Sequence, residues 1–168
     1  LNPTHSRGLD GLFRPASVAV VGATAKHGKP GYSLLHALLK HGFAGKVYPV
    51  TPTNDEVHGL KAYKSIAELP EAPDVALIIT PAATVPGLID ECGAKGVRNA
   101  IVFSAGFEES SEGKELAVRL ADAARRHGIT VIGPNCQGLW SVRAKAILTY
   151  SPAATNLAHL QHAPIAIV

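Results

Sequence analysis

Short apolar runs recur along the chain, and most of them are continuous rather than alternating. They lie at 18–21, 47–50, 75–79, 100–103, 129–132 and 165–168. A continuous apolar run is typical of a strand that is buried on both faces, as in a parallel sheet. The pattern therefore predicts strands at these positions.

Helical periodicity fills three of the gaps between these runs. The expected start and stop residues are Ser33 and Gly42, Thr84 and Gly96, and Ser110 or Ser111 with Gly128. The stretch 51–74 is less regular, with a short helical turn expected at 65–69, and 141–164 is expected to be an extended linker. Strand alternating with helix predicts an α/β fold with a Rossmann-like, doubly wound and mostly parallel sheet.

Composition narrows the class of protein. The 168 residues are 46% hydrophobic and 17% charged, as in a globular domain. The net charge of +3 suits an anionic small molecule, and the absence of any Lys/Arg run argues against a nucleic-acid partner. No stretch reaches the roughly 18 apolar residues of a membrane helix, and the two cysteines lack metal-binding spacing. We expect a reduced, cytoplasmic protein without a metal site or membrane contact.

The segments after the first five strands share one chemical character. In an open α/β sheet, ligands bind beyond the carboxyl ends of the strands. Here each end is small, hydroxylated or proline-rich, at 22–31, 51–53, 80–82, 104–109 and 133–138. Because these ends meet at one edge of the sheet, they predict a surface that a ligand can approach closely.

The first of these segments, 22–31, is a glycine-rich turn from strand to helix. It is not a GxGxxG motif, because Thr24 occupies a glycine position, and it is not a P-loop, because Pro30 follows its Gly-Lys pair. Its backbone N–H groups and the following helix N-terminus can still hold a phosphate. The Thr24 hydroxyl and the charges of Lys26 and Lys29 favour the same ligand.

The end of the second strand separates two kinds of nucleotide site. An NAD site places Asp or Glu there to accept hydrogen bonds from the ribose hydroxyls. This chain has Val50-Thr51-Pro52, and its first acidic residue afterwards is Asp55. The missing acid disfavours NAD and permits a ribose that carries a phosphate, such as that of coenzyme A (CoA).

Several blocks of the sequence resemble one known family. The stretch 9–23, LDGLFRPASVAVVGA, resembles the opening of the ADP-forming acyl-CoA synthetases. That family includes the CoA-binding part of the succinyl-CoA synthetase alpha subunit and of related protein lysine acetyltransferases. Further blocks resemble the family in the same order, at 48–50, 55–63, 74–81, 104–107 and 133–138. The resemblance covers about residues 9 to 140.

The resemblance implies a CoA-binding Rossmann domain over residues 1–140. It places the loop 22–31 against the CoA phosphates, 50–52 near the adenosine, and 80–82 with 104–106 beside the pantetheine. The cofactor-binding residues it implies are Gly22, Ala23, Thr24, Lys26, Gly28, Gly31, Val50, Thr51, Pro52, Thr80, Pro81, Ala82, Ser104, Ala105, Gly106 and Asn135. The chain departs from the family at Thr51 and Thr53, where asparagine and a nearby basic residue are common. The cation that contacts the 3′-phosphate is therefore not assigned, and the alternatives are Lys26, Lys29 and a residue outside this chain.

The rest of the family's machinery is expected outside this chain. Residues 141–168 are expected to form a linker and, at 165–168, the first strand of a truncated second domain. The resemblance assigns the family's phosphorylated histidine to that second domain, and ATP or ADP to an ATP-grasp domain or subunit. No histidine here has a matching context, so we expect no catalytic residue. The implied parent is an acid–thiol ligase that forms acyl-CoA from acid, CoA and nucleoside triphosphate, and a homo-oligomer is possible.

Other functions stay open at this point. The same module could present acyl-CoA in a protein lysine acetyltransferase, act alone as a CoA- or nucleotide-binding regulator, or bind NAD(H). Glu108 and Glu109 could form an acid/base pair, although acids before a helix also favour its dipole. Cys136 lies beside the expected thiol end of CoA, where a mixed disulfide competes with a role as a small buried side chain.

Overall fold

The computed structural model describes residues 9–107 and 110–161. Its strands are β1 (Ser17–Val21), β2 (Lys46–Val50), β3 (Glu56–Val57), β4 (Leu60–Lys61), β5 (Val75–Ile78), β6 (Asn99–Val102), β7 (Thr130–Ile132), β8 (Leu139–Ser141) and β9 (Ala146–Leu148). Its helices are α1 (Asp10–Phe13), α2 (Pro30–Lys40), the 3₁₀ turn η1 (Ala82–Thr84), α3 (Val85–Lys95), α4 (Ser111–His127) and α5 (Pro152–Asn156).

Five strands form one parallel sheet in the order β2-β1-β5-β6-β7. Each of them lies within one residue of a predicted apolar run, so the expectation of a Rossmann-like, mostly parallel sheet is confirmed. The sixth expected strand, at 165–168, lies outside the described residues.

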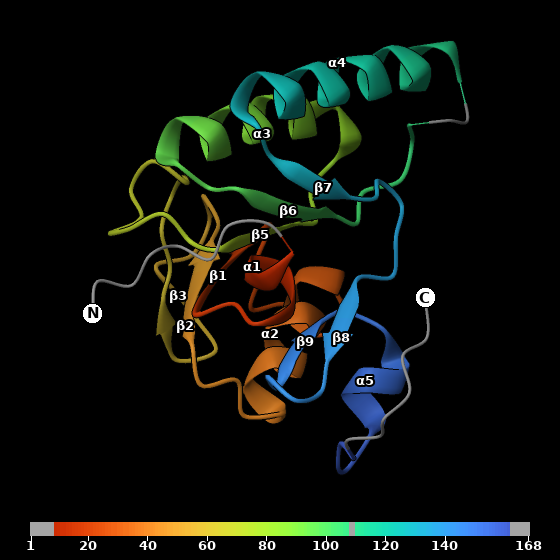
Figure 1. Cartoon of the computed structure of the whole chain (residues 1–168). Coiled ribbons are helices and arrows are strands. Elements are labelled where there is room, and N and C mark those ends of the chain that lie inside the picture. The colour runs from red at the N-terminus through yellow and green to blue at the C-terminus, as the bar shows by residue number, and fades with distance from the viewer. Residues whose placement is uncertain (1–8, 108–109, 162–168) are drawn as a thin grey trace.

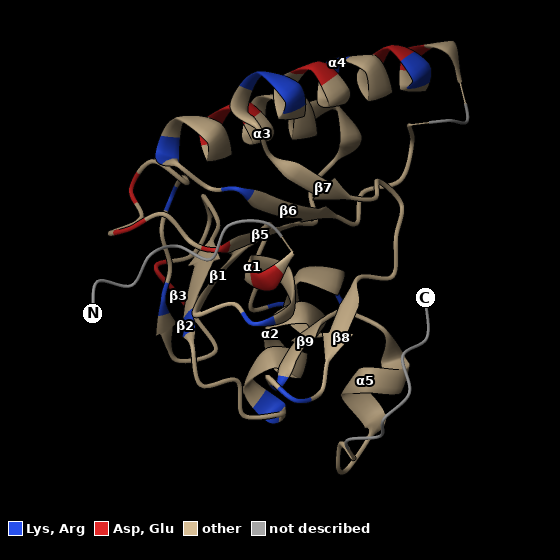
Figure 2. Ribbon diagram, viewed as in Figure 1, with Lys and Arg blue, Asp and Glu red and all other residues tan. Residues whose placement is uncertain are grey.

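Helices cover both faces of this sheet (Figure 1). Val18 and Val20 pack in one cluster with leucines of α2, whereas Ala19 and Val21 pack in another with residues of α3 and α4. Successive side chains of β1 therefore alternate between two buried faces, and all five of its residues are buried. This is why the apolar runs are continuous and not alternating. The outer helix α4 carries acidic and basic residues along its length (Figure 2).

The strand order reverses between β1 and β5. The chain leaves β1 through α2 on one face, and it leaves β5 through α3 on the other (Figure 1). In doubly wound sheets a crevice forms at such a switch point, outside the carboxyl ends of the two strands. The topology thus favours a ligand site after Val21 and Ile78.

Several of the predicted helix boundaries are confirmed, and one start is wrong. Gly96 and Gly128 end α3 and α4 in the left-handed conformation, and Ser110 caps α4 by accepting a hydrogen bond from the Gly113 N–H. Helix α2 begins at Pro30 and not after Ser33, because proline fits the first turn of a helix, where its missing N–H is not needed.

The region after β7 also differs from its prediction. An extended linker was expected here, but residues 139 to 156 form the antiparallel hairpin β8–β9 followed by α5. The three residues of β9 are fully buried, and β9 and α5 both contact α2. Between β2 and β5, 56–61 forms the small hairpin β3–β4, and 65–69 forms turns without a helix.

Candidate functional site

The strand ends that were predicted to form a surface are joined by hydrogen bonds along one edge of the sheet. The N–H groups of Gly22 and Ala23 donate to the Val50 carbonyl, at 3.0 and 3.2 Å. The Ser104 hydroxyl donates to the Thr80 carbonyl at 2.5 Å, and the Asn135 N–H donates to the Ser104 carbonyl at 3.1 Å. The structure therefore brings all five segments to the same edge.

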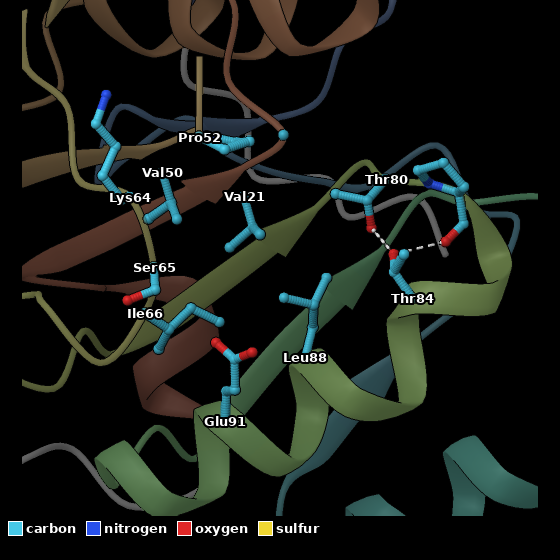
Figure 3. A pocket seen from close by; sticks show the side chains of 12 residues that line it. Val21, Val50, Pro52, Lys64, Ser65, Ile66, Thr80, Thr84, Leu88 and Glu91 are labelled. Atoms are coloured by element: carbon cyan, nitrogen blue, oxygen red, sulfur yellow. Dashed lines mark hydrogen bonds between the residues drawn. The ribbon is translucent and has the colours of Figure 1, made fainter. Parts of the chain in front are cut away.

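A pocket of about 270 Å³ opens at the switch point, between the ends of β1, β2 and β5 and the first turns of α3 (Figure 3). It is lined by Val21, Gly22, Val50, Pro52, Lys64, Ser65, Ile66, Thr80, Pro81, Thr84, Leu88 and Glu91. The pocket lies where the topology favours a ligand.

The pocket has an apolar interior and a polar rim. Val21, Val50, Ile66 and Leu88 point into a common space (Figure 3). Charged and hydroxyl groups stand around it, from Lys64, Ser65, Thr80, Thr84 and Glu91. A few polar groups around apolar walls are typical of a site for a small organic ligand, such as a flat ring with polar edges.

Lys64 is held at the rim by two contacts. Its ammonium nitrogen lies 2.6 Å from Asp55 Oδ1 and donates to the Asn54 carbonyl at 3.1 Å. The hydrogen bond and charge of Lys64 lower the pKa of the Asp55 carboxyl below its usual value. Both side chains are substantially exposed, at 44% for Lys64 and 94% for Asp55.

Two threonines form the opposite part of the rim, where β5 turns into α3. The Thr84 hydroxyl donates to the Pro81 carbonyl at 2.7 Å and lies 2.9 Å from the Thr80 hydroxyl (Figure 3). Thr84 is the residue before α3, as predicted, but its side chain makes no capping bond to that helix. Its hydroxyl belongs to the pocket instead.

Two glycines bring the loop 22–31 against the edge of the sheet. Gly22 has φ +94°, and a Cβ there would lie 2.5 Å from the Ile79 carbonyl oxygen. A Cβ on Gly31 would lie 2.1 Å from the Gly22 carbonyl oxygen. Because Gly22 and Ala23 donate inward to β2, their N–H groups are not available to a ligand, whereas Lys26, later in the loop, is exposed.

Only part of the predicted site lines the pocket. Gly22, Val50, Pro52, Thr80 and Pro81 do so. The residues predicted elsewhere on the same edge are Ala23, Thr24, Lys26, Gly28, Gly31, Thr51, Ala82, Ser104, Ala105, Gly106 and Asn135.

Seven lining residues were not predicted, namely Val21, Lys64, Ser65, Ile66, Thr84, Leu88 and Glu91. Leu88 and Glu91 follow Thr84 at helical spacing, so the predicted helix could have indicated them. The segment 64–66 carries no comparable signal, because it lies in the irregular turn that follows the β3–β4 hairpin.

Of the remaining chemical candidates, Cys136 takes a structural position. Cys136 is half-buried with its thiol 3.4 Å from the Val102 carbonyl, and burial raises its pKa, so the thiol stays protonated and unreactive at neutral pH. This favours the small buried side chain over the mixed disulfide. Glu108 and Glu109 lie outside the described residues.

Across 9–107 and 110–161, no group of three or more His, Cys, Asp or Glu side chains could hold a metal ion. No helix in those ranges is long and apolar enough to span a bilayer.

Comparison with known proteins decides the family. A family model described as a CoA binding domain matches residues 16–140. This chain belongs to that family of CoA-binding domains. The match contains β1 to β7 and every residue of the pocket, so the site described above is the candidate CoA site of a CoA-binding domain.

This chain has several relatives that are named as ADP-forming ligases. It is 42% identical over 149 residues to the alpha subunit of an ADP-forming acetate–CoA ligase I from Pyrococcus furiosus, covering 86% of this chain and 32% of the relative. It is 36% identical over 138 residues to an ADP-forming 4-hydroxybutyrate–CoA ligase from Nitrosopumilus maritimus, covering 82% of this chain and 20% of the relative. The chain thus spans a third or less of these relatives.

Solved structures agree in fold. The dinucleotide-forming acetyl-coenzyme A synthetase 1 of Ca. Korarchaeum cryptofilum, solved with phosphate and ADP, superposes with a TM-score of 0.82 at 42% identity, covering 88% of this chain and 32% of that one. The protein PH0766 of Pyrococcus horikoshii superposes with a TM-score of 0.80 at 38% identity, covering 85% and 33%.

Proposed function

We propose that this CoA-binding domain is the CoA-carrying part of an ADP-forming acyl-CoA synthetase. The observation that carries the proposal is the apolar pocket at the switch point, bounded by Val50 and Pro52 at the end of β2, where no acidic residue stands to select an unphosphorylated ribose. The ADP-forming ligases among its relatives support the parent activity.

The pocket suits the adenine end of CoA. An adenine ring between the side chains of Val21, Val50, Ile66 and Leu88 would be removed from water on both faces. Its polar edge would meet the rim, where Glu91 offers a carboxylate to an amino group. This placement would direct the ribose toward the loop after β2.

The rest of CoA would follow the edge of the sheet. The pyrophosphate would lie against the loop 22–31, where Lys26 contributes positive charge and the start of α2 a favourable dipole. The pantetheine would pass 80–82 and 104–106 toward Asn135. The thiol would then face other domains of the parent enzyme.

We propose that catalysis belongs to those other domains. The parent reaction would join an acid to CoA at the expense of a nucleoside triphosphate, through a phosphorylated histidine on a second domain that begins near residue 165. ATP and ADP would bind an ATP-grasp domain or subunit. Both cysteines are free, which fits a reducing compartment such as the cytoplasm.

The acetyltransferase and regulator alternatives receive no support from the two relatives described above, which are named as ADP-forming ligases. The test of CoA binding is calorimetric titration of the purified protein with CoA and, separately, with NADH. We expect CoA to bind more tightly. Tighter binding of NADH, or no heat with CoA, would overturn the proposal.

A further inference from the structure

We propose that Lys64 binds the 3′-phosphate of CoA and makes this site selective for the phosphorylated ribose. The inference rests on the proposed function and assigns a residue that sequence reasoning left open between Lys26, Lys29 and an unnamed cation. Lys64 comes from the turn after the β3–β4 hairpin, a segment to which the sequence pattern assigned no role.

The first argument is position. Among the residues that line the pocket, Lys64 is the basic one and Glu91 the acidic one. Lys64 rises from the rim near Pro52, and its ammonium points away from the apolar interior (Figure 3). Its hydrogen bond to the Asn54 carbonyl places that ammonium over the loop after β2. A nucleotide bound in a doubly wound sheet directs its ribose to this loop.

The second argument is the chemistry of that loop. The Thr51 and Thr53 hydroxyls lie 3.1 Å apart, and the Thr53 hydroxyl donates to Asn54 Oδ1 at 3.0 Å. These neutral polar groups can share hydrogen bonds with a ribose and its phosphate. Lys64 adds the charge that a phosphate monoester needs, since such a group carries about −1.5 to −2 at pH 7.

The third argument is that the ion pair now made by Lys64 can be exchanged. Its partner Asp55 is 94% exposed on its side chain, and exposed pairs of this kind contribute little stability. A more highly charged phosphate can therefore displace Asp55, whose carboxylate is free to turn into solvent. Asp55 then opposes the phosphate by repulsion, so it should weaken CoA binding.

The other lysines near this edge are placed differently. Lys26 and Lys29 belong to the loop 22–31 on the α2 side and do not line the pocket. Lys61 lies on the hairpin close to Lys64, but its ammonium sits 5.2 Å from the ring centre of Tyr63 and does not line the pocket either. Lys61 is therefore a matched control for a general loss of positive charge.

The experiment measures the affinities of CoA and dephospho-CoA, which differ only in the 3′-phosphate, by calorimetry. The proteins are the wild type, Lys64→Met, Lys64→Arg, Asp55→Asn and Lys61→Met. We expect Lys64→Met to weaken CoA about tenfold, the equivalent of losing ~1.4 kcal/mol, and to leave dephospho-CoA within about twofold. Lys64→Arg should keep most of the preference for CoA, and Asp55→Asn should increase it. Lys61→Met should change neither affinity by more than about twofold.

Three results would overturn the role of Lys64 while leaving CoA binding intact. They are equal wild-type affinities for CoA and dephospho-CoA, equal weakening of both ligands by Lys64→Met, or the same selective loss in Lys61→Met as in Lys64→Met. The second result would mean that Lys64 only supports the hairpin. Failure of the wild type to bind either ligand would refute the proposed function itself.

Discussion

At the scale of single residues, the site depends on two glycines, Gly22 and Gly31, because neither has a side chain. Gly22 and Gly31 let the loop 22–31 approach both β5 and the start of α2, where any side chain would meet backbone. A backbone contact cannot move aside as the end of a flexible side chain can. The two glycines therefore set the distance between the loop and the edge of the sheet.

We predict that Gly31→Ala destabilises the protein by about 1–3 kcal/mol, because the added methyl group meets the Gly22 carbonyl at 2.1 Å. The matched control is Gly87→Ala in α3, where a Cβ meets nothing within 4 Å. There, loss of unfolded-state entropy should stabilise the protein by about 0.4–1 kcal/mol. Urea unfolding measures both, and equal effects of the two substitutions would contradict the contact argument.

The buried thiol of Cys92 should make stability depend on alkaline pH. Burial raises the pKa of this thiol to about 12, whereas an unfolded thiol titrates near 8.5, roughly. The thiol's pKa is higher in the folded state than in the unfolded state. Its contribution to the free energy of unfolding is therefore complete below the unfolded pKa and is lost as pH rises toward 12.

We therefore predict that the free energy of unfolding falls between pH 8 and pH 10.5, and that it falls by about 2 kcal/mol less in Cys92→Ala. Urea titrations of both proteins at the two pH values give this difference, in which other titrating groups cancel. An identical fall in both proteins would mean that Cys92 does not ionise on unfolding.

At the scale of elements, the hairpin β8–β9 is the least expected part of the fold. Its strands are three residues each, too short for periodicity to separate them from a linker. Ile147 is fully buried and clusters with Ala37 of α2 and Ala154 of α5. The hairpin thus joins the C-terminal part of the described chain to the CoA-binding domain.

We predict that Ile147→Ala lowers the free energy of unfolding by about 2–5 kcal/mol and Ile147→Val by about 0.5–1.5 kcal/mol. The graded pair separates lost packing from a general disturbance of the hairpin. Guanidinium unfolding followed by circular dichroism measures both values. If 139–156 were a linker independent of the domain, both variants would unfold like the wild type.

At the scale of the whole molecule, the site is a product of strand order. The pocket draws on segments from residue 21 to residue 91, which meet because β1 and β5 are neighbours with their helices on opposite faces. Any ligand bound there connects the two halves of the sheet. Binding should accordingly stabilise the entire domain.

We predict that CoA at a hundredfold excess over its Kd stabilises the protein by about 2.7 kcal/mol, raising Tm by about 5–10 °C for a domain of this size. Leu88→Trp, which fills the pocket from α3, should abolish most of this increase. Differential scanning calorimetry with and without CoA measures each shift against the variant's own baseline. An undiminished shift in Leu88→Trp would place CoA outside the pocket.

Much of this fold can be predicted from local pattern. The five parallel strands were found because burial on both faces demands continuous apolar runs, and α3 and α4 because Gly96, Ser110 and Gly128 have conformations or capping bonds that few other residues supply as well. The common edge of the strand ends follows from parallel pairing alone. The absence of an acidic residue directly after Val50 is also evident from the sequence alone.

Other features depend on contacts between distant residues, which no local pattern encodes. The sequence by itself determined the fold class, the edge that carries the candidate site and the expectation of CoA rather than NAD, because these follow from periodicity and from residue type at strand ends. Only the tertiary structure decided that Lys64, Ile66 and Leu88 share a pocket, and that β9 packs on α2. The physical reason is that these residues are brought together by the turn after a hairpin and by the packing of helices on the sheet. The geometry of both is defined only when the whole chain folds.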